Sequence, residues 1–486
     1  MVKRLMPSPK YYFLIIILLA IFFSFWKLGS NDLIEWDEAE YGTISFEMMH
    51  NGDYINYYYA GTPDTRNAKP PLMIWSIILC YKIFGYTAFA LRFTSAIASI
   101  IFFFFSFKLI NLYRGKLFAF IACLVLLSCK VIVGFHVGRT GDTDALLVCL
   151  LTASVYFFLL FQDFGKRYAV FIFAILLGMA FYTKGPAGFV LIPGMFLYSF
   201  ITGKWKNVIR DYRLWLAILI VLLIAGSWVL ILLKKGNEFN SGNSWYGSHN
   251  AIETLFSHDT IARLTDSEFE PDRNPDRTFF FSVLDIRFNI WNYFFYLSLL
   301  LVIAKFIHDK KWAMMTLKAS GSQLALLSAC TILPLSIILT MAATKHEWYL
   351  APLALFISVI ITEGIIYCNN KYKWFNYVWI GVLIFNLSRQ FIYVNFAKKD
   401  MQDFFLKNKS YFEHAPVVEL FQMPTQDFYL YLNWHANKIE VPGNKSIQYP
   451  SSNLIIFDSR VSKVEDFPSS KLIDCNKKYC LASMLK

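Results

Sequence analysis

The stretch YYFLIIILLAIFFSFWKLGSNDLIEWDEAEY, residues 11–41, joins a long apolar run to an acidic, aromatic loop that contains Asp37 and Glu38. The rest of the 486 residues continues in this way, with 56% hydrophobic, 18% aromatic and only 16% charged residues. A soluble globular enzyme is far less apolar, so the composition indicates a polytopic membrane protein. The acidic loop directly after the first apolar run points to chemistry at a bilayer surface.

Eleven apolar windows have the length, roughly 17 to 25 residues, that a membrane-spanning helix needs, the shortest being the weakest. They are 11–28, 87–110, 117–137, 143–162, 168–183, 186–202, 213–233, 284–307, 322–343, 348–368 and 374–394. A shorter apolar stretch at 71–84 opens with Pro70-Pro71 and ends at Gly85. Its length and its prolines predict a helix that lies in the membrane interface.

The basic residues fall in the short loops on one side of these predicted spans, which is the positive-inside pattern. The formal charge of +12 therefore indicates membrane orientation rather than a nucleic acid partner. We expect an integral plasma (inner) membrane protein with a cytoplasmic N-terminus, and with residues 29–86 and the C-terminus outside. The inner loops are too short for a nucleotide-binding domain, so any substrate has to be available on the outer face.

The sequence predicts two domains. The first is a transmembrane domain at 1–394, which includes the first outer loop at 29–86, and the second is a small extracytoplasmic domain at 395–486. In this tail, the runs Val417 to Gln422, Phe428 to Leu432 and Leu454 to Phe457 are typical of strands. Cys475 and Cys480 lie outside the apolar stretches. Their spacing allows a disulfide in an oxidising compartment, and two unpaired thiols are the alternative. The predicted fold class is an all-α polytopic membrane protein with a small α/β C-terminal domain.

The acids of the first outer loop have few basic residues near them in sequence. A carboxylate such as Asp37, beside the apolar Trp36 and Tyr41, can act as a general base for an acceptor hydroxyl. Alternatively, Asp37 and Glu38 cap an interfacial helix that runs toward His50. Lys69, just before the prolines, can meet a phosphate or simply bind any lipid headgroup.

Three further corners place charged residues on the same outer face. One is the run Gly138 to Asp144, which contains Arg139, Asp142 and Asp144, and in which one acid can cap the following span. The others are Thr183-Lys184-Gly185-Pro186 and Lys345-His346-Glu347-Trp348-Tyr349. A transporter or lipid flippase is the main alternative function, but such proteins place ionisable residues near the membrane midplane. A structural scaffold would leave the acidic loop without a role.

One acidic loop facing several cations fits the transfer of a sugar from a lipid phosphate to a hydroxyl. The phosphate leaving group needs charge neutralisation, and the attacking hydroxyl needs one carboxylate base. A single inverting displacement is predicted, with Asp37 as the base and Lys69, Lys184 and Lys345 around the phosphate.

An ordered set of short motifs resembles the ArnT-like and protein O-mannosyltransferase group of membrane glycosyltransferases of the GT-C fold. The motifs are Asp37 to Tyr41, Gly52-Asp53-Tyr54, Lys69-Pro70-Pro71-Leu72, Ala90 to Phe93, Thr143 to Leu147, Thr183 to Pro186, and Lys345 with Tyr349 and Pro352. The resemblance implies about eleven transmembrane helices with juxtamembrane helices, and a polyprenyl-phosphate sugar donor used at an active site facing away from the cytoplasm. It implies Asp37 as base, Glu38 as its catalytic neighbour, Asp144 as a second acid, and Lys69, Lys184, Lys345 and Tyr349 as donor contacts. We also place Arg92, Arg139 and His346 in the predicted substrate-binding set.

The sequence departs from the aminoarabinose transferases of this group at two positions. Those enzymes resemble one another in having an arginine where Glu40 stands and a glutamate where Ala68 stands, the latter linked to a metal near the lipid phosphate. Because an alanine cannot bind a metal, we assign no metal or other cofactor and do not name the sugar. A lipid such as lipid A, another glycan and a protein all stay open as the acceptor, as does the oligomeric state.

Overall fold

The computed structural model describes most of the chain. The described residues are 8–64, 69–134, 136–235, 251–265, 276–308, 320–395, 399–415, 418–421, 425–436, 439–440, 454–460, 462–467 and 470–484. Ala68, at which the sequence departs from the aminoarabinose transferases, lies outside them.

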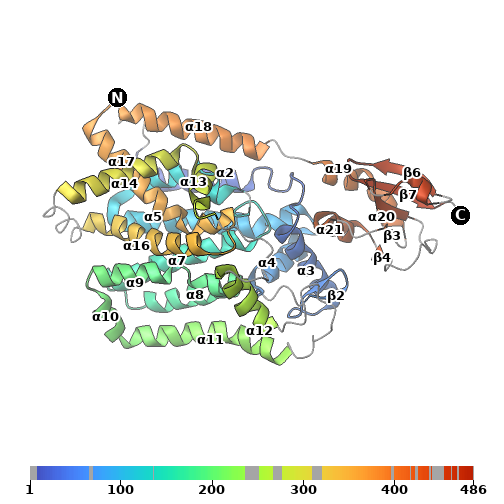
Figure 1. Cartoon of the computed structure of the whole chain (residues 1–486), viewed down its shortest axis with the longest axis horizontal. Helices are drawn as coiled ribbons and strands as arrows, with labels where there is room; N and C mark the ends of the chain where they lie inside the picture. Colours follow the sequence, from blue (N-terminus) through green and yellow to red (C-terminus); the bar gives the residue numbers. More distant parts are fainter. Residues whose placement is uncertain are drawn as a thin grey trace.

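The part of the chain before residue 396 is a bundle of helices (Figure 1). Its first elements are α2 (Tyr12–Phe25), α3 (Asp37–Asn51), the short strands β1 (Tyr58–Tyr59) and β2 (Thr62–Pro63), α4 (Leu72–Phe84), α5 (Ala88–Leu127), α6 (Lys130–Val133), α7 (Thr143–Gln162) and α8 (Ala169–Lys184). They are followed by η1 (Gly185–Phe189), α9 (Ile192–Ile201), α10 (Trp205–Arg210), α11 (Tyr212–Lys235), α12 (Ala251–Glu253) and the π-helical η2 (Thr254–Ala262). The last are α13 (Phe279–Phe288), α14 (Trp291–His308), α16 (Ser320–Met341), η3 (Glu347–Leu353), α17 (Ala354–Lys371) and α18 (Phe375–Asn395).

The tail contains helices and one five-stranded sheet, at the right of Figure 1. Its elements are α19 (Asp400–Lys407), α20 (Lys409–His414), β3 (Val418–Phe421), α21 (Gln426–His435), β4 (Ile439–Glu440), β5 (Leu454–Asp458), η4 (Val464–Asp466), β6 (Ser470–Cys475) and β7 (Tyr479–Met484). The strand order is β4-β3-β5-β7-β6, with β3 parallel to β4 and β5, and with β7 antiparallel to β5 and β6. Cys475 and Cys480 form a disulfide across the β6–β7 pair.

The structure confirms a mostly helical membrane protein with a small sheet near its C-terminus. Among the described residues, seven helical stretches are long and apolar enough to cross a membrane. Three shorter apolar helices are α2, α4 and α9, of which α2 and α9 lie in the predicted windows 11–28 and 186–202. Helix α4 covers the stretch 71–84 for which the sequence predicts an interfacial helix, and Pro71 stands at its N-cap.

Three predicted span boundaries are wrong. The helix in the window 117–137 ends already at Leu127, after which the chain turns, and Gly115 with φ 76° kinks the long helix that starts at Ala88. The window 186–202 contains a 3-10 turn followed by a ten-residue helix, because Pro186 and Pro193 each remove a backbone N–H donor. The window 284–307 is divided at Asn289, whose left-handed φ of 54° ends α13.

In the tail, two of the three predicted strands are confirmed and one is wrong. The runs near Val418 and Leu454 are β3 and β5. The run Phe428 to Leu432 is instead part of α21, and all five of its residues are buried. A continuous apolar run of this length fits a buried strand and a buried helix equally well.

Helix α21 packs against α3 of the loop at 29–86, so the tail shares a hydrophobic core with that loop. Leu430 contacts the surface of α3 at Gly42. The hydroxyl of Tyr431 accepts a hydrogen bond from the backbone N–H of Leu33 at 3.1 Å. The carboxylate of Asp32 accepts hydrogen bonds from the first backbone N–H groups of α19. The division of the chain at residues 394 and 395 stays a prediction.

Substitution of Gly42 by alanine tests this packing. A Cβ atom at position 42 would collide with the Cδ2 atom of Leu430, so Gly42→Ala should overpack the α3–α21 interface. We expect it to destabilise the protein by about 1–3 kcal/mol. Gly226→Ala, within α11 and with nothing within 4 Å of its Cβ position, is the matched control. Thermal unfolding in detergent measures both, and equal melting temperatures would contradict the described contact.

A second prediction concerns Glu47, which is buried between α3 and the tail and accepts a hydrogen bond from the Gly61 N–H. Burial raises the pKa of Glu47 above its ordinary value of 4.5. Protonation therefore favours the folded state, and stability should fall as the pH rises from 4.5 through the pKa of the folded protein. Glu47→Gln should be more stable than the wild type at pH 7 and lose this advantage below pH 4.5. Unfolding measured across this pH range checks the sign, and an advantage that grows toward low pH would refute it.

Candidate active site

Asp37 is the first residue of α3, and Lys69 lies just before α4, so the folding of the loop at 29–86 brings them together. The Lys69 Nζ is 3.9 Å from an Asp37 carboxylate oxygen, and 29% of the Asp37 side chain is exposed. Lys69 also donates a hydrogen bond of 2.8 Å to the Tyr41 hydroxyl. Burial raises the pKa of Tyr41 well above its ordinary value, so the phenol stays neutral. The site thus offers a reachable carboxylate beside a positioned cation.

Glu38 is buried and holds Asp37 in place. Its carboxylate accepts two hydrogen bonds from Arg92 of α5, at 2.7 and 2.8 Å, and further ones from the N–H groups of Ile34 and Gly141. Arg92 in turn donates to backbone carbonyls of residues 28, 31 and 32. These contacts make Glu38 and Arg92 positioning residues by geometry, while a direct catalytic role for Glu38 and a substrate contact for Arg92 stay predictions.

His136 is part of the cluster although the sequence analysis did not single it out. Its Nδ1 lies 2.7 Å from Asp142 and 3.9 Å from Asp37. The backbone of His136 has a left-handed φ of 63°, a strained conformation that is often found at functional sites. His136 is the penultimate residue of the apolar window 117–137. A polar side chain at the end of an apolar window was the sequence feature that could have identified it.

Asp142 caps α7, as the sequence analysis expects of one acid in this run. Its side chain accepts a hydrogen bond from the N–H of Thr143. Burial by itself raises the pKa of Asp142, but the hydrogen bond with His136 and the nearby Lys184 have the larger combined effect, so the pKa lies below its ordinary value. The carboxyl group is therefore ionised.

Asp144, in the first turn of α7, and Lys184, at the end of α8, form an ion pair of 2.6 Å. The Lys184 ammonium also lies 5.9 Å from the ring centroid of Tyr349 in η3. The Tyr349 hydroxyl accepts a hydrogen bond of 2.8 Å from Arg263 near the end of η2. Arg263 is not predicted from the sequence, because nothing in a long polar loop indicates which of its residues will contact the site.

Three further residues of the predicted substrate-binding set have their own contacts. They are His346, Arg139 and Lys345. His346 stacks on Trp348, which stacks on His136 with ring centroids 3.7 Å apart. Arg139 donates to backbone carbonyls of residues 23, 24, 26 and 27 and thereby fixes the end of α2. Lys345 is buried, donates to the Ala342 carbonyl at 2.6 Å, and has a pKa lowered by burial. Substrate contacts by these residues stay predictions.

Asp37, His136 and Asp142 are the described residues whose side chains could together hold a metal ion. One ligand atom from each lies within 4.8 Å of the others. Carboxylate oxygens and an imidazole nitrogen suit a divalent transition metal. Two lysines adjoin the carboxylates of this possible metal site. Lys69 lies beside Asp37, and Lys184 lies near Asp142.

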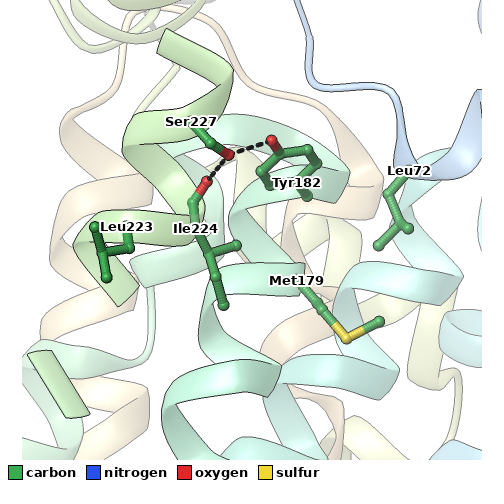
Figure 2. Close-up of a pocket in the computed structure, with 6 residues that line it drawn as sticks. All are labelled: Leu72, Met179, Tyr182, Leu223, Ile224 and Ser227. Atoms are coloured by element: carbon green, nitrogen blue, oxygen red, sulfur yellow. Dashed lines mark hydrogen bonds between the residues drawn. The ribbon is translucent and has the colours of Figure 1, made fainter. Parts of the chain in front are cut away.

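An apolar pocket of about 410 Å³ opens between α4, α8 and α11 (Figure 2). Its lining residues are Leu72, Met179, Tyr182, Leu223, Ile224 and Ser227. Its polar groups bond to each other, since the Tyr182 and Ser227 hydroxyls are 2.5 Å apart and Ser227 donates to the Ile224 carbonyl. Leu72 is three residues after Lys69, so the pocket begins close to the charged cluster.

Comparison with known proteins finds similarity to glycosyltransferases over less than half of the chain. Residues 68–231 match the dolichyl-phosphate-mannose-protein mannosyltransferase family. The undecaprenyl phosphate-alpha-4-amino-4-deoxy-L-arabinose arabinosyl transferase of Aeromonas hydrophila is 28% identical over 45% of this chain. A second such transferase, from Proteus mirabilis, is 31% identical over 46% of this chain. The matched segments span 40% and 41% of the length of these relatives.

The whole fold has close counterparts among solved structures. ArnT from Cupriavidus metallidurans bound to undecaprenyl phosphate has a TM-score of 0.70 at 14% identity, over 97% of both chains. The Archaeoglobus fulgidus oligosaccharyltransferase has a TM-score of 0.53 at 12% identity, over 88% of this chain and 64% of that one. The resemblance inferred from the sequence motifs is thereby confirmed, and the fold is of the GT-C type.

The Glu38–Arg92 pair yields a prediction for stability. The side chains of Arg92 and Glu38 are 2% and 1% exposed, so Glu38→Gln leaves a buried guanidinium without its counter-charge. We expect a loss of about 3–5 kcal/mol of folding free energy. Arg92→Met should also destabilise the protein, and the double variant should lose much less than the sum of the two single effects. Additive losses in thermal unfolding would show that the pair does not act as a unit.

Proposed function

We propose that this protein is a membrane glycosyltransferase that moves a sugar from a polyprenyl-phosphate donor to an acceptor on the outer face of the membrane. The observation that carries the proposal is the partly exposed carboxylate of Asp37, held 3.9 Å from Lys69. A reachable base beside cations is what this reaction requires. The named transferases among the relatives and the undecaprenyl phosphate bound in the ArnT crystal structure support the same donor class.

In the proposed reaction, an acceptor oxygen attacks the anomeric carbon of the donor sugar. The new bond forms as the bond between that carbon and the phosphate oxygen breaks, and Asp37 takes the proton from the attacking hydroxyl. The leaving group departs as polyprenyl phosphate, whose negative charge Lys69 and Lys184 stabilise. One displacement of this kind inverts the anomeric configuration.

The apolar pocket supports the lipid part of the donor. It is lined mainly by Leu72, Met179, Leu223 and Ile224. Leu72 follows Lys69 by three residues in the chain. A phosphate held at Lys69 could therefore extend its polyprenyl chain between α4, α8 and α11. Burial of such a chain is favourable in proportion to the apolar area that is removed from water.

The orientation with the site and the C-terminal domain outside is part of the proposal. It is supported by the basic inner loops and by the Cys475–Cys480 disulfide, since disulfides persist in oxidising compartments. The transporter or flippase alternative receives less support, because the described acids and lysines of the cluster gather at helix ends. Lipids such as lipid A, other glycans and proteins all stay candidate acceptors.

Asp37→Asn is the direct test of the chemistry. The variant keeps the size of the side chain but loses the base, so transfer should fall by about 10²–10⁴-fold. Mass spectrometry of membrane glycolipids and glycoproteins from cells with and without the protein identifies the product, and its formation by purified wild-type and variant membranes gives the rate. Glu35→Gln, an exposed acid in the same loop, is the matched control and should transfer at the wild-type rate. Unimpaired transfer by a folded Asp37→Asn variant would remove Asp37 from the proposed role.

A further inference from the structure

Trp36, the residue directly before the proposed base Asp37, has a strained backbone. Its φ is 73° and its ψ is −125°, a combination that glycine adopts readily and a bulky residue adopts rarely. Such a conformation costs free energy and persists only where the surrounding structure enforces it. Strained residues of this kind are found preferentially at functional sites.

The chain on both sides of Trp36 enforces the strained conformation. Arg92 donates hydrogen bonds to the backbone carbonyl of Asp32 at 2.8 Å and to the carboxylate of Glu38 at 2.7 Å. The backbone N–H of Ile34 donates to the same carboxylate at 2.8 Å. The segment is therefore fixed before and after Trp36, and the backbone of Trp36 has to connect the two fixed parts.

A tryptophan is also a poor choice for the start of a helix. Trp36 is the N-cap of α3, and its backbone carbonyl accepts the N–H of Glu40 at 2.8 Å, but its side chain makes no capping hydrogen bond. Serine, threonine, asparagine, aspartate and glycine are the residues that stabilise this position. Glycine would in addition remove the strain, so tryptophan stabilises neither the turn nor the helix.

The side chain of Trp36 does not compensate for this cost by packing. Trp36 is 67% exposed. Within the part of the chain that the structure describes, its indole belongs to no hydrophobic cluster, stacks on no other ring and donates no hydrogen bond. A large side chain that is held at such a cost, and that contributes nothing to the fold, indicates a contact with another molecule.

Anchoring in the bilayer interface is the ordinary role of an exposed tryptophan in a membrane protein. Such an anchor has to lie at the right depth, and its backbone needs no special conformation. Trp26, just after α2, is also exposed, and its φ of −59° is ordinary. The strain at Trp36 therefore indicates that the direction of its side chain matters, and not its depth alone.

The exposure of Asp37 shows from which side a substrate can reach the candidate site. The Asp37 side chain is partly exposed, whereas the side chains of His136 and Asp142 beside it are 7% and 1% exposed. A substrate therefore reaches the Asp37 carboxylate from the exposed side of the first turn of α3. Consecutive Cα atoms are about 3.8 Å apart, so a sugar ring at Asp37 is within reach of the Trp36 indole.

We infer that the indole of Trp36 packs against the ring of the sugar that is transferred, a step that rests on the proposed function. The C–H groups on the face of a sugar ring carry partial positive charge, and the face of an indole is negative, so the two faces attract each other. A glycosylated polyprenyl phosphate has such a ring next to its phosphate, and the sugar-free lipid that leaves after transfer does not. Trp36 thus favours the loaded donor over the spent lipid.

Native mass spectrometry of the purified full-length protein in detergent tests this inference, because it reports the mass of each bound lipid. The Asp37→Asn variant is used as the background, since it keeps the donor from being consumed. It is incubated with a lipid extract of the cells that carry the protein, to which undecaprenyl phosphate is added. The measured quantity is the ratio of glycosylated to sugar-free polyprenyl phosphate that stays bound.

Two substitutions of Trp36 in this background define the contribution of the indole. We expect Trp36→Gly to lower the ratio about fivefold, because the attraction between the ring faces is lost, and to leave the binding of undecaprenyl phosphate unchanged. Trp36→Phe keeps an aromatic face and should keep most of the ratio. Trp374→Gly, which removes an exposed tryptophan just before α18, is the matched control and should bind as the background does.

Thermal unfolding of the same variants tests the structural part of the inference. Trp36→Gly should keep or raise the melting temperature, because glycine adopts the φ of 73° without strain. A lower melting temperature would show that the indole supports the fold and would overturn the inference.

The binding results separate this inference from the proposed function. An unchanged ratio in Trp36→Gly overturns the role of Trp36 and leaves the proposed transferase standing. If transfer in membranes nevertheless falls in that variant, Trp36 is a bilayer anchor, since detergent solution contains no bilayer. If neither the wild type nor Asp37→Asn retains any glycosylated polyprenyl phosphate, the proposed donor class is overturned together with the inference.

Discussion

The buried pair between Glu38 and Arg92 is the interaction on which the arrangement of the candidate site depends. It joins the first turn of α3 to α5, and Glu38 also accepts the N–H of Gly141 in the loop before α7. Three segments that are distant in sequence are thus fixed to one carboxylate. Asp37 is the adjacent residue in the chain, so its direction is set by a contact that is itself shielded from water. Asp37 is thus partly exposed, while Glu38, the neighbour that fixes its position, is buried.

Charge balance explains why so many ionisable groups can share one corner of a membrane protein. Asp37, Asp142 and Asp144 are each within reach of a lysine or a histidine, and none of these pairs lies in the middle of an apolar helix. Helix ends supply backbone N–H groups as well, as Asp142 at the start of α7 shows. A donor phosphate entering this corner would therefore meet cations that are already oriented, which lowers the reorganisation needed for reaction.

Much of the fold and about half of the site geometry follow from the sequence. Long apolar windows predict the helices, and short motifs at their ends predict that Asp37, Lys69, Asp144 and Lys184 come together. The sequence does not reveal the direction in which a side chain points. Lys345 donates a hydrogen bond to the nearby Ala342 carbonyl, and Arg139 donates one to the Phe23 carbonyl at the end of α2. His136 is hidden in an apolar window, and α21 has the composition of a strand. In each case tertiary packing, which has no local signature, decides the outcome.

The packing of α21 on α3 has a consequence for how the protein is made. The loop at 29–86, which contains Asp37, is synthesised long before residues 400–435, which supply the surface that supports it. Contacts between such distant parts of a chain form late and slowly. The nascent protein therefore passes through a stage in which the helices before α19 can form while the loop at 29–86 still lacks its contacts with α19 and α21. The support of α3 is thus complete only once the tail, and not merely the apolar helices, has been synthesised and has folded.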